Sequence, residues 1–186
     1  MMIDANRSWL LVVDIQEKLV AAVHQADQFV ENCAWLVELA AMVGVPIVFS
    51  EQYPKGLGHT LPRLTDLAPA AQVVEKVHFS CLSANCLPSE LLSQRKQVII
   101  CGMESHVCVL QTTLGLINEG KEVYVVADVV SSRTTHDIQL ALARMQQAGA
   151  VIVSREMVLF EWLRQAGTPQ FKAVSARFLQ ATRPAV

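Results

Sequence analysis

Residues 97–109 read QVIICGMESHVCV, an apolar run that leads into a polar loop carrying His106 and Cys108. The run from Val98 to Cys101 has the length and composition of a buried strand, and apolar residues at helical spacing begin again near His106. A strand that passes directly into a helix is the repeating unit of α/β proteins. The segment therefore predicts an α/β fold in which Cys108 lies at the start of a helix that follows a strand.

The remainder of the chain repeats this alternation in both directions. Short apolar runs alternate with amphipathic stretches, and no segment rich in Pro, Ser or Gly divides them. Strands that are buried on both faces and joined by helices indicate a mostly parallel, doubly wound sheet with right-handed crossovers. We expect six strands, at residues 9–13, 45–49, 73–74, 98–101, 122–127 and 150–153.

Two of the helices carry specific expectations. The first has apolar residues at steps of three and four from Val30 to Ala41, with Asp27 as the expected N-cap and Gly44 just beyond the end. The second helix follows the loop that contains Cys108. Its buried face is expected to consist of Val107, Leu110, Leu114 and Ile117.

Length and charge narrow the class of protein. The chain has 186 residues, which suits one compact domain, and we expect residues 1–186 to form a single domain. Fifteen basic and 17 acidic residues give a formal net charge of −2, so we expect no basic surface that would attract nucleic acid. The composition therefore favours an interaction with a small-molecule substrate.

The sequence shows no targeting or membrane signal. No apolar run approaches the ~18 residues that cross a bilayer, and the first residues lack the basic start and long apolar stretch of a secretory signal. The five cysteines have no C-x-x-C spacing, which favours reduced thiols. We therefore expect a cytoplasmic protein that does not bind membranes.

Reactive side chains follow the ends of four expected strands. Asp14 closes the first, Glu51 follows the second, Lys76 lies just past the third, and Cys108 follows the fourth. Ligands of doubly wound sheets bind beyond the carboxyl ends of the strands, so we expect these side chains to converge there. A helix start favours thiolate over thiol, which predicts a reactive Cys108. Asp14 could take its proton, and Lys76 could stabilise the developing negative charge.

Three other uses of the residues near this edge stay open. His78 could act as the base of a Cys–His pair. Zinc could bind His59, His78 and Glu51, although their spacing matches no compact ligand motif. Cys108 could form a redox pair with Cys101, although Cys101 is expected to point into the sheet.

Six motifs, spread over nearly the whole chain, point to a known family. They are VVDIQ at 12–16, EQYPKGLG at 51–58, EKVHFS at 75–80, GMESHVCV at 102–109, DVVSSR at 128–133 and SREMVLFE at 154–161. Together they resemble the isochorismatase-like hydrolase superfamily, most closely its isochorismatase-domain-containing branch. The resemblance implies a three-layer α/β/α fold and an Asp-Lys-Cys catalytic triad at Asp14, Lys76 and Cys108. It also implies a cis peptide bond between Met103 and Glu104, with the backbone N–H groups of Glu104 and Cys108 forming an oxyanion hole.

Two comparisons within that superfamily bear on the chemistry. Nicotinamidases place a metal with an Asp-x-His pair after the second strand, whereas this chain has SEQY at residues 50–53, so we expect neither a metal nor another cofactor. True isochorismatases cleave a vinyl ether without needing the nucleophilic cysteine. The presence of Cys108 therefore favours acyl chemistry.

The leading hypothesis is a metal-independent cysteine hydrolase that cleaves the C–N bond of a small amide through a thioester. Gln16, Gln52, Tyr53 and Phe79 are expected to line its substrate pocket. One alternative is vinyl ether hydrolysis of an isochorismate-like compound, and another is a weakly active or inactive scaffold that binds a protein partner. The resemblance also implies a homo-oligomer. The candidate contact residues near the C-terminus are Phe160, Trp162, Leu163, Phe171, Phe178 and Leu179.

Overall fold

The computed structural model describes residues 2–179, and its sheet has six parallel strands in the order β3-β2-β1-β4-β5-β6. The chain runs outward from β1 to β3, crosses back to the middle, and then runs outward from β4 to β6. This order confirms the predicted doubly wound α/β sheet. The strands are β1 (Ser8–Val13), β2 (Ile47–Gln52), β3 (Gln72–Lys76), β4 (Gln97–Met103), β5 (Glu122–Ser131) and β6 (Val151–Val153).

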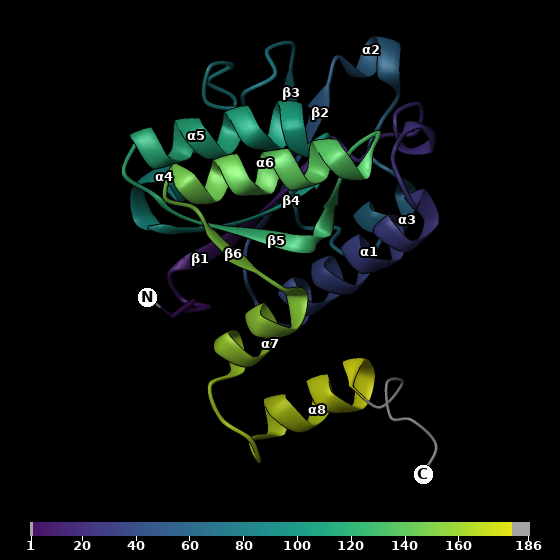
Figure 1. The fold of residues 1–186 in the computed structure, drawn as a ribbon. Coiled ribbons are helices and arrows are strands. Elements are labelled where there is room, and N and C mark those ends of the chain that lie inside the picture. The colour runs from purple at the N-terminus through teal and green to yellow at the C-terminus, as the bar shows by residue number, and fades with distance from the viewer. Residues whose placement is uncertain (1, 180–186) are drawn as a thin grey trace.

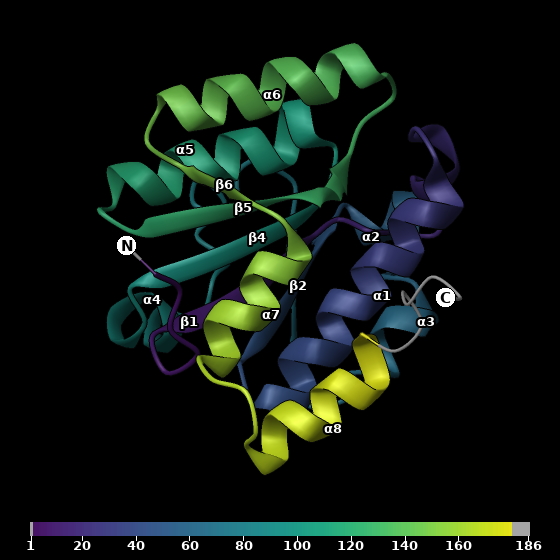
Figure 2. The ribbon, with the colours of Figure 1, turned by 60° about the horizontal axis from the view of Figure 1, so that its bottom comes forward.

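Helices cover both faces of this sheet, which gives the three layers expected from the resemblance. Figure 2 shows α1, α7 and α8 on one side and α5 and α6 on the other. Each side has its own apolar core, and the residues of β1 alternate between the two: Leu10 and Val12 join the first, and Leu11 and Val13 the second. The helices, labelled in Figure 1, are α1 (Ala26–Val43), α2 (Pro54–Leu57), α3 (Pro62–Thr65), α4 (Ser89–Gln94), α5 (Leu110–Asn118), α6 (Thr135–Gln147), α7 (Arg155–Leu163) and α8 (Pro169–Phe178).

Several strands extend further toward their carboxyl ends than predicted. β2 continues to Gln52 rather than ending at Phe49, and Lys76 is the last residue of β3 rather than a residue just past it. The apolar pattern stops at Phe49, but the buried polar side chains of Ser50 and Glu51 still lie within the hydrogen-bonded ladder. The sheet therefore carries polar side chains into the interior at this end.

The first long helix begins differently from the prediction and ends as predicted. Gln25, in a left-handed conformation with φ of 49°, is its N-cap, so the assignment of Asp27 to that position was wrong. Asp27 lies in the first turn instead, where its negative charge still favours the positive end of the helix dipole. Gly44, with φ of 76°, ends the helix, which confirms its predicted role.

The helix after Cys108 packs its predicted residues against the core, but most of them are not its most buried residues. A π-type turn at Ser105–Val109 precedes α5, and this wide turn holds one residue more than an α-helical turn. Leu110 is buried, and Val107, Leu114 and Ile117 are partly buried and pack against the same core. The most buried residues of this segment are Cys108, Val109, Leu110, Thr112, Thr113 and Leu116.

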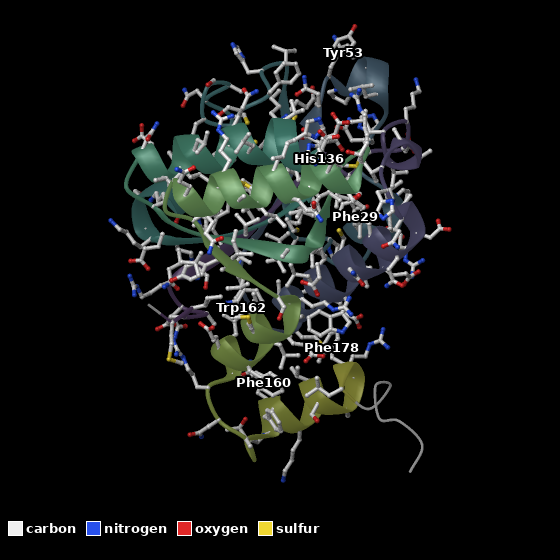
Figure 3. All side chains as sticks on the ribbon, viewed as in Figure 1. Phe29, Tyr53, His136, Phe160, Trp162 and Phe178 are labelled. Carbon is white, nitrogen blue, oxygen red and sulfur yellow. The ribbon has the colours of Figure 1, made fainter. Side chains whose placement is uncertain are left out.

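The apolar residues near the C-terminus pack mainly within the chain. Trp162, Leu163 and Phe178 are buried in the core that α1 shares with α7 and α8, and Phe171 packs partly against it. Phe160 stays exposed, and Figure 3 shows it beside α8 at the far end of the molecule from Tyr53. The predicted contact surface is thus largely internal.

No helix among residues 2–179 combines the length and the apolar character that a membrane span requires.

Candidate active site

Asp14 follows β1 and is buried at the carboxyl end of the sheet. Its backbone adopts a left-handed conformation with φ of 55°, an uncommon geometry for a residue other than glycine. The Ser50 hydroxyl donates to Asp14 Oδ1 at 2.7 Å, and Lys76 Nζ donates to Oδ2 at 2.6 Å. Burial raises the pKa of the Asp14 carboxyl, although Lys76, Ser50 and Cys108 each act to lower it.

Lys76, the last residue of β3, has a fully buried side chain. Besides its contact with Asp14, Nζ donates to Gln52 Oε1 at 2.7 Å, and Gln52 is its partner on the neighbouring strand. Burial opposes the charged form, but the negative charge of Asp14 and the proximity of Cys108 raise the pKa of Lys76 above its ordinary value. Lys76 is therefore an ammonium ion paired with Asp14.

Cys108 lies in the π-type turn after β4, and only 7% of its surface is exposed. Burial and the adjacent Asp14 raise the pKa of its thiol to about 12, although Lys76 acts to lower it. The expectation that a helix start holds Cys108 as a thiolate is thus wrong for this environment. Desolvation and a neighbouring carboxylate outweigh the helix dipole, so at neutral pH the thiol keeps its proton.

The loop between β4 and Cys108 is tightly constrained. Gly102 has φ of 124°, and a Cβ added there would lie 2.2 Å from the Val13 carbonyl oxygen, so only glycine allows β1 and β4 to approach this closely. The bond between Met103 and Glu104 is cis. Arg133 Nε donates to Glu104 Oε1 at 2.6 Å, which fixes the loop from outside.

The residue that follows β5 supports the same loop. The Ser132 hydroxyl lies 2.9 Å from His106 Nδ1 and in hydrogen-bonding contact with the hydroxyl of Ser105. His106 is thus part of the framework that holds the turn of Cys108.

The four residues expected to line a pocket have different surroundings. Gln16 is buried, and its Nε2 donates to the carbonyls of Gln52 at 3.0 Å and Gly58 at 2.7 Å, so it links the end of β2 to the end of α2. Gln52 contacts Lys76, as described above. Phe79 is 52% exposed on the loop after β3. Tyr53 is also exposed and projects from the end of the molecule at α2, as Figure 3 shows.

Tyr53 borders a pocket of about 430 Å³ at this edge of the sheet. Of the three triad positions, Lys76 lies in its wall, and His78 borders it too. The lining residues are Tyr53, Pro54, Lys55, Glu75, Lys76, Val77, His78 and Ala84.

Two of the alternative sites lack the necessary geometry. Glu51 accepts hydrogen bonds from the Thr60 backbone at 2.7 Å and lies 3.0 Å from His59 Nδ1, but among residues 2–179 no three His, Cys, Asp or Glu side chains form a metal-binding group. Cys101 lies in the core on the opposite side of the sheet from Cys108, so the proposed redox pair is wrong.

Sequence reasoning missed one member of the site. Ser50 bonds directly to the Asp14 carboxylate, and the signal available was its position just after an apolar strand, beside Glu51. The strand pattern placed Asp14, Lys76 and Cys108 at one edge, and the structure does bring these three side chains together.

A buried acid, amine and thiol lie together at the switch point of a doubly wound sheet, the place where ligands bind in α/β proteins of this class. Comparison with known families is more specific. The Isochorismatase domain model matches residues 8–157. The chain therefore belongs to the isochorismatase family of hydrolases.

Two relatives are similar along most of their length. The secreted isochorismatase effector Isc1 of Phytophthora sojae is 38% identical over 175 residues, covering 91% of this chain and 83% of that protein. Isochorismatase domain-containing protein 2A of Mus musculus is 38% identical over 167 residues, covering 90% and 80% respectively. Because the first of these is described as secreted, the cytoplasmic location of this chain stays a prediction.

Solved structures share the whole fold. A structure of MAR1 ribonuclease from Caenorhabditis elegans has a TM-score of 0.90 and 35% identity, covering 99% of this chain and 95% of that chain. YcaC from Pseudomonas aeruginosa, described with hexane-2,5-diol and covalent acrylamide, has a TM-score of 0.85 and 26% identity, covering 97% and 93%. The Escherichia coli YcaC structure, described as an octameric hydrolase of unknown specificity, has a TM-score of 0.85 and 25% identity, covering 96% and 91%.

Proposed function

We propose that this protein is a metal-independent cysteine hydrolase that cleaves the C–N bond of a small amide. The observation that carries the proposal is the buried Asp14–Lys76 ion pair, with 2.6 Å between Nζ and Oδ2, in contact with the thiol of Cys108. A thiol with a pKa of about 12 needs a base before it can attack a carbonyl at neutral pH. The neighbouring carboxylate of Asp14 supplies that base.

In the first half of the reaction, Asp14 takes the Cys108 proton as the sulfur bonds to the amide carbon. The carbonyl oxygen becomes an oxyanion, which we assign to the backbone N–H groups of Glu104 and Cys108. The N–H groups of Val107 and Val109 already donate to the Glu104 carbonyl, at 3.1 and 3.2 Å, and so are committed elsewhere. Asp14 then gives its proton to the leaving nitrogen, the C–N bond breaks, and a thioester forms.

In the second half, the carboxylate of Asp14 takes a proton from water as the water oxygen attacks the thioester carbon. The C–S bond breaks, the acid product leaves, and the proton returns to the Cys108 sulfur. Lys76 keeps its charge throughout. Its role is to hold Asp14 in place and to offset the negative charge that develops nearby.

One relative supports a reactive nucleophile in this family. The Pseudomonas YcaC structure is described with covalent acrylamide, a compound that thiols attack at its alkene carbon. The C. elegans relative is described as a ribonuclease, but the formal net charge of −2 here favours a small neutral ligand over RNA. The proposal of an amide substrate therefore rests on the triad. RNA is included among the substrates tested below.

A substrate screen tests the proposal directly. Small primary amides, isochorismate and RNA are offered to the wild type, to Cys108→Ala, and to Cys86→Ala, a matched control that removes another thiol. We expect ammonia from at least one amide, no ammonia with Cys108→Ala, and retained activity with Cys86→Ala. Undiminished ammonia release by Cys108→Ala would contradict the mechanism. Pyruvate from isochorismate without ammonia from any amide would assign vinyl ether hydrolysis instead.

We further propose that residues 1–186 form one domain and that the protein is a homo-oligomer. The homo-oligomer is supported by the Escherichia coli relative, which is described as octameric. Light scattering of the purified protein measures its mass in solution, and a monomer at micromolar concentration would contradict the prediction.

A further inference from the structure

The loop between β3 and α4 carries a pair of thiols that the proposed hydrolysis does not use. Cys81 and Cys86 close one turn: the Cys86 backbone N–H donates to the Cys81 carbonyl at 3.3 Å, and the Cys86 thiol lies 3.5 Å from the same oxygen. A disulfide joins residues whose Cα atoms lie about 4.4–6.8 Å apart. The hydrogen-bonded turn brings the two residues close together before any bridge forms.

This turn is anchored to the body of the protein. The Cys81 N–H donates to the Thr112 hydroxyl on α5 at 3.1 Å, and Ser80 Oγ accepts from the Leu82 N–H at 3.2 Å. Cys81 is fully buried, whereas Cys86 is partly exposed. Cys86 can therefore react with a solute, whereas Cys81 is shielded from solvent. This is the arrangement of a reactive cysteine and its resolving partner.

The charges around the pair favour Cys86 as the thiol that reacts first. The neighbouring Cys81 side chain lowers the pKa of Cys86, and the nearby charge of Lys76 lowers it further, against the opposing effect of burial. The proximity of Cys86, together with burial, raises the pKa of Cys81 above its usual range. Thiolate character therefore concentrates on the more accessible sulfur.

A second pair of neighbouring thiols provides an internal control. Cys33 and Cys101 are both fully buried in the core, and burial, with a smaller effect of Cys101, raises the pKa of Cys33 well above its ordinary value. The two pairs differ in access, because Cys86 is partly exposed whereas Cys33 and Cys101 are fully buried. The Cys81–Cys86 pair therefore offers one thiol to an oxidant, which thiol oxidation requires.

We propose that Cys81 and Cys86 form a reversible disulfide when the protein meets a hydroperoxide. The Cys86 thiolate sulfur attacks the peroxide oxygen, the O–O bond breaks, and Cys86 becomes a sulfenic acid while the leaving oxygen takes up a proton. The Cys81 sulfur then attacks the Cys86 sulfur, so that the S–S bond forms, the S–O bond breaks, and water leaves with the Cys81 proton. The two sulfurs lose two electrons in total, and the peroxide gains them.

The disulfide affects the pocket as well as the loop. Ala84 lies between the two cysteines and borders the pocket that also contains Lys76. A bridge across the turn fixes this part of the pocket wall. The disulfide itself does not depend on the proposed hydrolase activity, because its formation involves neither Asp14 nor Cys108.

Mass spectrometry of the full-length protein tests the proposal. Reduced protein is treated with hydrogen peroxide, remaining thiols are alkylated, and the peptides are mapped. We expect a mass loss of two hydrogen atoms, a bridge that joins Cys81 to Cys86, and its reversal by dithiothreitol. Cys33 and Cys101 should stay reduced and should react with the alkylating reagent only after denaturation.

Cysteine variants show which thiols form the disulfide. Cys86→Ser and Cys81→Ala should each lose the intramolecular disulfide, whereas Cys108→Ser should still form it. Cys86 is partly exposed, so Cys86→Ser is expected to fold, and circular dichroism checks this. A bridge to Cys108, or oxidation of Cys86 to sulfinic acid while Cys81 stays a free thiol, would overturn the proposal.

Discussion

The two ends of the parallel sheet bury polar groups in opposite ways. At the amino end, the Gln97 side chain is fully buried and neutral, and it bonds to the Asp4 N–H at 2.7 Å, to Glu122 at 2.9 Å and to the Tyr124 hydroxyl at 3.3 Å. At the carboxyl end, Asp14 and Lys76 are buried as an ion pair. Gln97 and the Asp14–Lys76 pair all have hydrogen-bond partners, but of different chemistry.

This difference indicates that the amino end of the sheet has a structural role and the carboxyl end a chemical one. A neutral amide with partners on three sides ties the strand starts together at a small desolvation cost. Burying a carboxylate and an ammonium costs several kcal/mol per ion, and apolar residues of similar volume are often at least as stable. A buried ion pair beside a thiol is therefore better explained by reactivity than by stability.

The largest expected effect comes from removing the nucleophile at the carboxyl end. Cys108→Ala should lower amide hydrolysis by about 10³-fold or more, because the remaining groups cannot form a thioester. Thermal unfolding should change far less than activity does. Steady-state kinetics and calorimetry on the same preparation measure the rate of hydrolysis and the thermal unfolding. If Cys108→Ala kept its activity but lost stability, the carboxyl end of the sheet would have a structural role too.

Breaking the ion pair should affect both stability and activity. Lys76→Met leaves Asp14 buried without its counter-ion and should lower the free energy of unfolding by about 3–5 kcal/mol, as well as abolish activity. The double variant Asp14→Asn, Lys76→Met should recover much of the stability but none of the activity. Urea unfolding with kinetics measures these changes. Equal stability of the single variant and the wild type would show that the pair is not effectively buried.

At the amino end, a substitution should affect stability alone. Gln97→Leu leaves its partners without hydrogen bonds and should lower the free energy of unfolding by about 1–3 kcal/mol, with kcat/KM unchanged. Gln94→Ala serves as the control, because its side chain makes only an exposed hydrogen bond to Glu90. A loss of kcat/KM in folded Gln97→Leu would show that the two ends are coupled.

The smallest expected effect is a change in pH dependence at the carboxyl end. The Ser50 hydroxyl donates to Asp14 and so lowers the pKa of that carboxyl, against the dominant effect of burial. Its removal in Ser50→Ala should raise the pKa of Asp14. Since Asp14 must be ionised to act as a base, the acid limb of the pH–rate profile should move to higher pH.

The control for this prediction is Ser131→Ala, which removes a hydroxyl that donates to the His24 carbonyl. Its profile should match that of the wild type. The wild-type acid limb itself should lie above 3.8, the ordinary pKa of the aspartate side chain. An unshifted limb in Ser50→Ala would mean that Asp14 is not the group whose ionisation limits the rate.

The sequence predicted the sheet and the edge at which reactive residues meet, because strand patterns and strand ends are local features. It did not predict the protonation of Cys108, since the burial of that thiol and its contact with Asp14 arise from segments far apart in the chain. The predicted face of α5 was only partly right. Its four apolar residues contact the core, but Thr112 and Thr113, which an apolar pattern cannot identify, are buried more deeply than three of them.

Trapping the acyl intermediate tests the central claim most directly. The protein is mixed with an amide that it hydrolyses, quenched in acid during turnover, and mapped by mass spectrometry. The mechanism predicts an acyl group, equal to the substrate less its amine, on the sulfur of Cys108 and its absence in Cys108→Ala. Turnover without any adduct on Cys108, or an adduct confined to another cysteine, would contradict nucleophilic attack by this residue.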